Sequence, residues 1–147
     1  MSHVFVSRAD EQNERDVARL LEKKWNCQIR KFGKLDPIDW WAERNNKVVA
    51  FIELKCRNVP STKYDTVFVT LRKWLDLLRA REWSFDEVSS LIVIRWTDRI
   101  GYYDVTQIPP GNLSVLRRRE HRAEQDVEPA WEIPIKNFKT IEVGDYA

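Results

Sequence analysis

The chain has 147 residues, 43% of them hydrophobic and 33% charged, with a formal net charge of +2. These values describe one soluble globular domain, and the mildly basic balance permits a nucleic-acid partner without requiring one. Two widely separated histidines and two cysteines without metal-ligand spacing exclude a recognisable zinc site, and the lack of a long apolar run or signal-peptide pattern predicts an intracellular, soluble (cytoplasmic) protein with no membrane partner.

The first predicted element is a helix that begins at Ser7, a good N-cap residue. Its apolar residues recur at helical spacing from Val17 to Trp25. Glu14 lies three residues before Val17 and seven before Leu21, so it belongs to the buried stripe of this helix. An acid on that stripe needs either a partner or a function. The alternative is an ordinary amphipathic helix with an acid near its start.

A first strand is predicted over 27–32, and Gly33 ends it. A second strand is entered over 36–41, and the apolar run 48–52 has the length and β-branched content of a buried third strand. This run ends in Glu53-Leu54-Lys55. Charged residues rarely end a buried strand unless they are paired or bind something.

The turn between the second and third strands is predicted at Asn45-Asn46-Lys47, because asparagine tolerates left-handed backbone. A three-residue loop would pair Arg44 with Val48 and bring Asp39 opposite Glu53, with their Cβ atoms about 5 Å apart. A two-residue loop would turn Asp39 to the other face of the sheet. Convergence of the two acids therefore requires a three-residue loop or a bulge.

Two carboxylates this close repel each other unless a cation lies between them. All-oxygen ligands favour Mg²⁺, with Mn²⁺ as a substitute. Glu53 and Lys55 point to the same side of their strand, so an ammonium group would stand beside the metal. A lysine there can act on an attacking water or on the charge of a phosphate. An acid, a second acid and a lysine at one metal are suited to cutting phosphodiesters.

The chain resembles the PD-(D/E)XK nuclease superfamily in Pro37-Ile38-Asp39 and Glu53-Leu54-Lys55. The resemblance implies an α/β, restriction-endonuclease-like α-β-β-β-α-β core, with a mixed central sheet flanked by helices. It also implies Mg²⁺-dependent endodeoxyribonuclease activity. The proline stands one residue further from the aspartate than in the literal motif, and Asp36 competes with Asp39 for the acidic position.

The same resemblance implies roles for other residues. The metal ligands would be Asp39 and Glu53, with the Leu54 carbonyl and Glu14 as further ligands and Glu11 as the substitute for Glu14. Lys55 would be catalytic. Lys73 matches an auxiliary catalytic lysine that many members carry on the next helix, although a lone lysine there is also typical of an ordinary surface.

The second half of the chain contains a polar loop over 56–64, a helix from Leu71 to about Glu82 capped by Thr70, two paired strands over 91–96 and 100–105, and a last strand over 131–135. Phe138 and Ile141 are expected to pack the tail against the body. Candidate contacts to a phosphate backbone are of two kinds, those in the loop and those in a basic cluster. They are Arg57, Lys63, Arg117, Arg118, Arg119 and Arg122. Solvated surface is the alternative for both groups.

The predicted organisation is a core over about 7–105 with a basic C-terminal extension over 106–147. Among small superfamily members, Holliday-junction resolvases fit best, and they act as homodimers so that two sites cut two strands. A phage- or mobile-element-type endonuclease of unknown target fits nearly as well. DNA is the expected partner, but RNA and linear substrates stay open. Two alternatives also stay open: an inactive nuclease-fold module that binds nucleic acid or a protein, and an unrelated α/β interaction domain in which Glu53 and Lys55 form a surface ion pair.

Overall fold

The structure is a computed structural model that describes residues 8–84, 87–106, 111–117 and 127–142. Its elements in chain order are α1 (Arg8–Trp25), β1 (Gln28–Lys31), β2 (Trp40–Arg44), β3 (Lys47–Cys56), β4 (Thr66–Thr70), α2 (Leu71–Glu82), β5 (Ser89–Arg95), β6 (Ile100–Asp104), β7 (Asn112–Arg117), β8 (Val127–Pro134), the 3₁₀ turn η2 (Ile135–Asn137) and β9 (Lys139–Thr140). The N-cap assigned to Ser7 lies outside the described residues.

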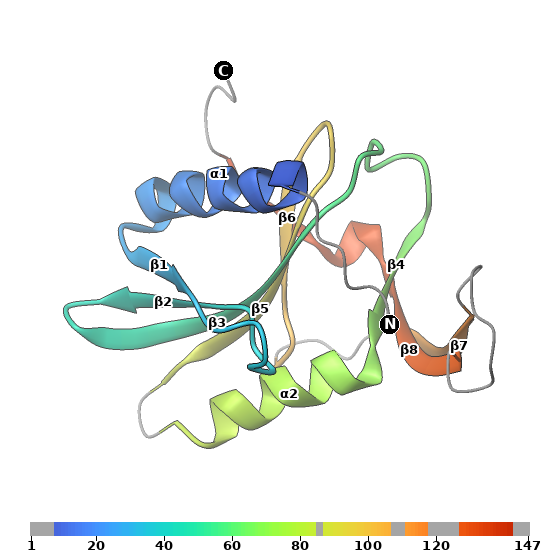
Figure 1. Cartoon of the computed structure of the whole chain (residues 1–147). Coiled ribbons are helices and arrows are strands. Elements are labelled where there is room, and N and C mark those ends of the chain that lie inside the picture. Colours follow the sequence, from blue (N-terminus) through green and yellow to red (C-terminus); the bar gives the residue numbers. More distant parts are fainter. Residues whose placement is uncertain (1–7, 85–86, 107–110, 118–126, 143–147) are drawn as a thin grey trace.

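In the described part of the chain, six strands form the main sheet in the order β1-β2-β3-β5-β6-β9. Strands β3 and β5 are parallel, and the other neighbours are antiparallel. Helices α1 and α2 cover opposite faces of this sheet (Figure 1). The predicted fold class, a mixed sheet flanked by helices, is confirmed.

Strand β3 alternates between the two faces, as the period of a strand requires. Ile52 and Leu54 join the core beneath α1, whereas residues of α2 such as Trp74 and Leu77 build the second core. Glu53 lies between two buried neighbours and is itself only 3% exposed. The fold therefore places a carboxyl group in the interior on the α2 side of the sheet.

A smaller sheet stands beside α2, and in the described residues its order is β4-β8-β7. Strand β8 pairs with β4, and β9 then adds to the edge of the main sheet. Phe138 and Ile141 are buried, which confirms that the tail packs against the body. Residues after 126, which sequence reasoning assigned to an extension, thus supply strands to both sheets.

The hairpin between β2 and β3 differs from the expected loop. Arg44 pairs with Lys47, so the loop has two residues, Asn45 and Asn46, both with positive φ. The three-residue loop was therefore wrong. The register shifts between Ala42 and Glu43, where β3 carries an extra residue, Val49. A two-residue turn alone would place Asp39 and Glu53 on opposite faces of the sheet, and the extra residue of the bulge returns them to the same face.

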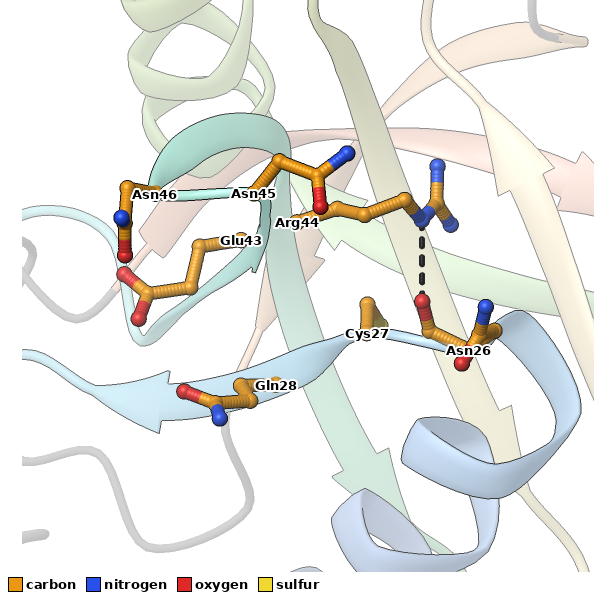
Figure 2. Close-up of a pocket in the computed structure, with 7 residues that line it drawn as sticks. All are labelled: Asn26, Cys27, Gln28, Glu43, Arg44, Asn45 and Asn46. Atoms are coloured by element: carbon orange, nitrogen blue, oxygen red, sulfur yellow. Dashed lines mark hydrogen bonds between the residues drawn. The ribbon is translucent and has the colours of Figure 1, made fainter.

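Arg44 also closes the C-terminal end of α1. Its guanidinium donates to the carbonyl oxygen of Asn26, at 2.9 Å (Figure 2). It also donates to the carbonyl oxygen of Trp25. The last carbonyls of a helix have no partners within the helix, and a cation suits this end of the dipole. The polar hollow around Arg44, of about 300 Å³, lies at the hairpin turn, roughly 20 Å along β3 from Glu53. We interpret it as a structural junction.

No described helix is long and apolar enough to cross a membrane.

Thr70 caps α2, as the sequence predicted: its hydroxyl oxygen accepts a hydrogen bond from the backbone N–H of Lys73, at 3.3 Å. We expect Thr70→Val to lower the free energy of unfolding by about 1 kcal/mol, because the N–H loses its acceptor. Thr70→Ser keeps the hydroxyl oxygen, so its free energy of unfolding should stay within a few tenths of a kcal/mol of the wild-type value. Urea unfolding of the three proteins measures the difference. Equal stability of the Val and Ser variants would refute a capping role.

Candidate active site

Two acids meet at the open end of the β2–β3 hairpin. Trp40 pairs with Ile52, so Asp39 falls one step further, opposite Glu53. The Glu53 side chain is buried and the Asp39 side chain is about one-third exposed. Burial raises the pKa of Glu53 most, and the nearby charge of Asp39 raises it further. The structure thus brings together the two acids that the sequence singled out.

Lys73 inserts its ammonium group between these acids from the first turn of α2. Its Nζ lies 3.3 Å from Glu53 Oε1 and 3.5 Å from Asp39 Oδ1, and it donates to the carbonyl oxygen of Pro37 at 3.2 Å. Burial alone would lower the pKa of Lys73, but the two carboxylates outweigh burial and raise it. A charged Lys73 therefore offsets the repulsion between the acids.

The Glu53 carboxyl group has one satisfied and one unsatisfied oxygen. Oε1 faces Lys73, whereas Oε2 is buried without a hydrogen-bond partner, and Lys55 Nζ lies 3.6 Å from it. A buried anionic oxygen without a partner is costly, and a cation is the partner it would accept most strongly. The donor set at this point consists of carboxylate oxygens, which fits a hard divalent ion.

The described residues offer no three acidic, histidine or cysteine side chains close enough together to hold a metal ion unaided. Asp39 and Glu53 would be the protein's carboxylate ligands. Magnesium commonly keeps several waters and takes only one or two carboxylates, so the set fits this ion. The main-chain oxygen of Leu54 stays a predicted further ligand, with the Leu54 side chain buried beneath α1.

Glu14 reaches the neighbourhood of the site from α1. Burial raises its pKa most; the positive charge of Lys31 lowers it, and the negative charge of Asp39 raises it. Lys55 and the indole N–H of Trp40 also act on this carboxylate. Glu14 is thus close enough to Asp39 for their charges to interact. Its role as a metal ligand stays a prediction.

Sequence reasoning missed Lys31 and the indole of Trp40 as parts of this site. The Lys31 ammonium lies 5.3 Å from the centre of the Trp40 ring. Lys31 follows buried Ile29 by two residues on β1, so alternation along the strand could have placed it on the inner face. Trp40 carried no comparable signal, because a buried tryptophan is usually part of a core.

Asp36, the competing acid, has a structural task. It is exposed, and its Oδ2 accepts the backbone N–H of Gly33 at 2.8 Å, which closes the turn after β1. The carboxylate is therefore engaged within its own loop. Between the two candidates, Asp39 is the acid that shares Lys73 with Glu53.

The candidate phosphate contacts separate into two groups. Arg57 and Lys63 are exposed in the segment after β3, and Arg57 lines the same hollow as Glu53, Lys55 and Lys73. This hollow has a volume of about 410 Å³. The backbone of Arg117 ends β7. The other three arginines of the basic cluster lie outside the described residues. They are Arg118, Arg119 and Arg122.

The fold is similar to a solved nuclease structure. The structure of Hjc, a Holliday junction resolvase from the archaeal hyperthermophile Archaeoglobus fulgidus, matches with a TM-score of 0.60 and 14% sequence identity, covering 95% of this chain and 98% of the other. At this identity the likeness establishes the shared fold. No curated protein matches the chain.

The sequence itself matches a nuclease family. The family described as "Phage putative PDDEXK endonuclease" matches over residues 2–141. The chain therefore belongs to this family of PD-(D/E)XK endonucleases, which confirms the resemblance and identifies the protein as a nuclease. Because this match covers residues 2–141, it argues against the unrelated α/β interaction domain that the sequence had left open.

The ionisation of Glu53 links stability to pH. Its pKa rises from 4.5 to about 7, first because of burial and second because of Asp39, while Lys55 and Lys73 counteract both in part. The folded protein keeps this proton over a pH range in which the unfolded chain has lost it. Stability therefore falls as pH rises from about 4.5 to 7, by about 3 kcal/mol at most.

We expect Glu53→Gln to raise the free energy of unfolding of the metal-free protein by about 1–3 kcal/mol at pH 8, because it removes a buried negative charge. Near pH 4.5 the effect should nearly vanish, since glutamine resembles the protonated acid. Thermal unfolding in a chelator at both pH values measures this. Glu82→Gln, at an exposed acid at the end of α2, is the control. A gain that is equal at both pH values would contradict the assignment.

Proposed function

We propose that the chain is a metal-dependent endonuclease that hydrolyses phosphodiester bonds in DNA, with Mg²⁺ as its ion and Mn²⁺ as a substitute. The observation that carries this proposal is the pair of opposed acids, Asp39 and Glu53, with a buried carboxylate oxygen that has no hydrogen-bond partner. Membership of the endonuclease family supports the same chemistry.

Each residue has a role that follows from its position. Asp39 and Glu53 would hold the ion, with Leu54 O and Glu14 as its further ligands. Once bound, the ion would polarise a phosphate oxygen and acidify a water molecule. Lys55 is half exposed beside Glu53, so its ammonium can orient the attacking water or neutralise charge that develops on the phosphate. Lys73 would act as the auxiliary cation that offsets part of the repulsion between the two carboxyl groups.

Branched DNA is the first substrate class to test. Hjc, whose fold is similar, is a Holliday junction resolvase. We propose a structure-specific activity for this chain, with a homodimer as the assembly that would cut two strands at one junction. Arg57 and Lys63, and the arginines at 117, 118, 119 and 122, would contact the phosphate backbone and make binding depend on salt.

Cleavage of labelled duplex, single-stranded, flap and four-way-junction DNA tests the proposal. We expect cutting that requires Mg²⁺ or Mn²⁺, and we expect Glu53→Ala and Asp39→Ala to lose at least about a hundredfold in rate. Glu82→Ala, an exposed acid elsewhere on α2, should cut like the wild type. Tight binding without any cutting by the wild type would favour the inactive module instead.

Metal binding can be tested without catalysis. We expect Mg²⁺ or Mn²⁺ at 100 times its dissociation constant to stabilise the wild type by about 2.7 kcal/mol. Glu53→Gln should respond far less, because a neutral amide is a weaker ligand. The response should grow as pH rises through 7, where the Glu53 carboxyl group loses its proton. Thermal unfolding with and without the ion measures it, and equal shifts for both proteins would exclude Glu53 as a ligand.

A further inference from the structure

A second hollow adjoins the candidate active site. It has a volume of about 430 Å³ and shares Arg57, Val67 and Phe68 with the hollow that is lined by Glu53, Lys55 and Lys73. The first hollow is lined by charged groups around Glu53, whereas the second has mostly apolar and aromatic walls. A substrate that lies in one hollow can therefore extend directly into the other.

The end of β3 and the residue after it, Arg57, lead from the first hollow to the second. Glu53, Lys55 and Arg57 follow one another at two-residue steps, so they share one side of the chain over about 13 Å. Lys55 and Arg57 are exposed, and among the described residues Arg57 has no ion-pair partner. This line of two cations suits a phosphate backbone that passes from the acids to the second hollow.

The walls of the second hollow present aromatic rings. Tyr64 is 60% exposed and Phe68 is 38% exposed, so their rings are available to a ligand. The Lys63 ammonium lies 5.6 Å from the centre of the Tyr64 ring. Trp96 lines the hollow but is buried, and it packs edge-to-face against Phe138 at 5.7 Å. The rigid floor and exposed rings favour a flat apolar ligand.

The loop that carries Tyr64 is fixed in place. The Asp98 carboxylate accepts both the backbone N–H and the hydroxyl of Ser61, each at 2.7 Å. These hydrogen bonds lower the pKa of Asp98, so it stays ionised at neutral pH. The carbonyl oxygen of Val59 accepts the N–H of Thr97, at 3.1 Å. A hollow held in this way is preformed, which reduces the entropic cost of binding.

We propose that this second hollow takes an unpaired nucleobase of the DNA strand whose phosphate lies at the acids. The proposal rests on the proposed nuclease function. The shared walls make the two hollows continuous, Lys55 and Arg57 complement the backbone, and Tyr64 and Phe68 provide stacking faces, which accept any base. A base inside a duplex could not enter, so the hollow would select strands with an unpaired nucleotide near the cut, as at branches, flaps and gaps.

An abasic scan tests this inference. Labelled flap and junction DNAs would each carry one abasic site, moved stepwise across the branch point, and fluorescence anisotropy in Ca²⁺ would give the dissociation constants. We expect one position at which the missing base weakens wild-type binding about tenfold. The variant Tyr64→Ala/Phe68→Ala should bind the intact DNA about tenfold more weakly and lose this sensitivity.

Two controls make the result specific. Trp83→Ala removes an aromatic ring that is 85% exposed beyond the far end of α2, and it should behave as the wild type. Tyr64→Leu/Phe68→Leu keeps apolar volume without flat rings, and it should lose the base-specific penalty while its thermal unfolding stays close to the wild type.

The possible results distinguish the base-binding hollow from the proposed nuclease activity on which it rests. An abasic penalty that is unchanged in both double variants, or absent at every position in a protein that cuts DNA, overturns the base-binding hollow and leaves the nuclease standing. A wild type that neither binds nor cuts DNA overturns both. If the loss of affinity at the abasic position disappears only when the Tyr64 and Phe68 rings are removed, the base-binding hollow is supported even if no cleavage is seen.

Discussion

The structure depends on one partly buried electrostatic contact, in which the Lys73 ammonium lies between the carboxyl groups of the buried Glu53 and the partly exposed Asp39. Burial of an acid is costly unless a cation compensates it. Here compensation is incomplete, because Oε2 of Glu53 keeps no hydrogen-bond partner and the pKa of Glu53 rises to about 7. The fold thus retains an unfavourable group at the place where a divalent ion would find its ligands.

Three separate pieces of secondary structure are needed to assemble this contact. The bulge at Val49 sets the parity of the hairpin, so that Asp39 and Glu53 share a face. The Thr70 cap fixes the start of α2, which carries Lys73. The parallel pairing of β3 with β5 buries the strand that holds Glu53. A change in any of these would alter the distance between charges rather than the fold class.

The smaller sheet gives the site its surroundings. Strand β4 lines both the charged hollow and the aromatic one, and β8 pairs with β4 as its neighbour in the smaller sheet. The chain belongs to a PD-(D/E)XK endonuclease family and shares its fold with a resolvase. Next to the candidate site lies a loop held by Asp98, with an exposed Tyr64, and an exposed Phe68 on β4.

Local patterns in the sequence determined the helices, the buried strands, the Thr70 cap and the acids and lysine at the ends of the hairpin strands, because spacing and side-chain chemistry are local properties. The register of the β2–β3 hairpin depends on contacts outside the hairpin sequence itself. The bulged register is favoured because it buries Trp40 and Ile52 together on the α1 face of the sheet. Tertiary packing alone decided that Lys31 lies near Glu14, and that Tyr64 and Phe68 line one hollow with Ile135. These residues are distant in sequence, so only the closed core fixes the distances between them.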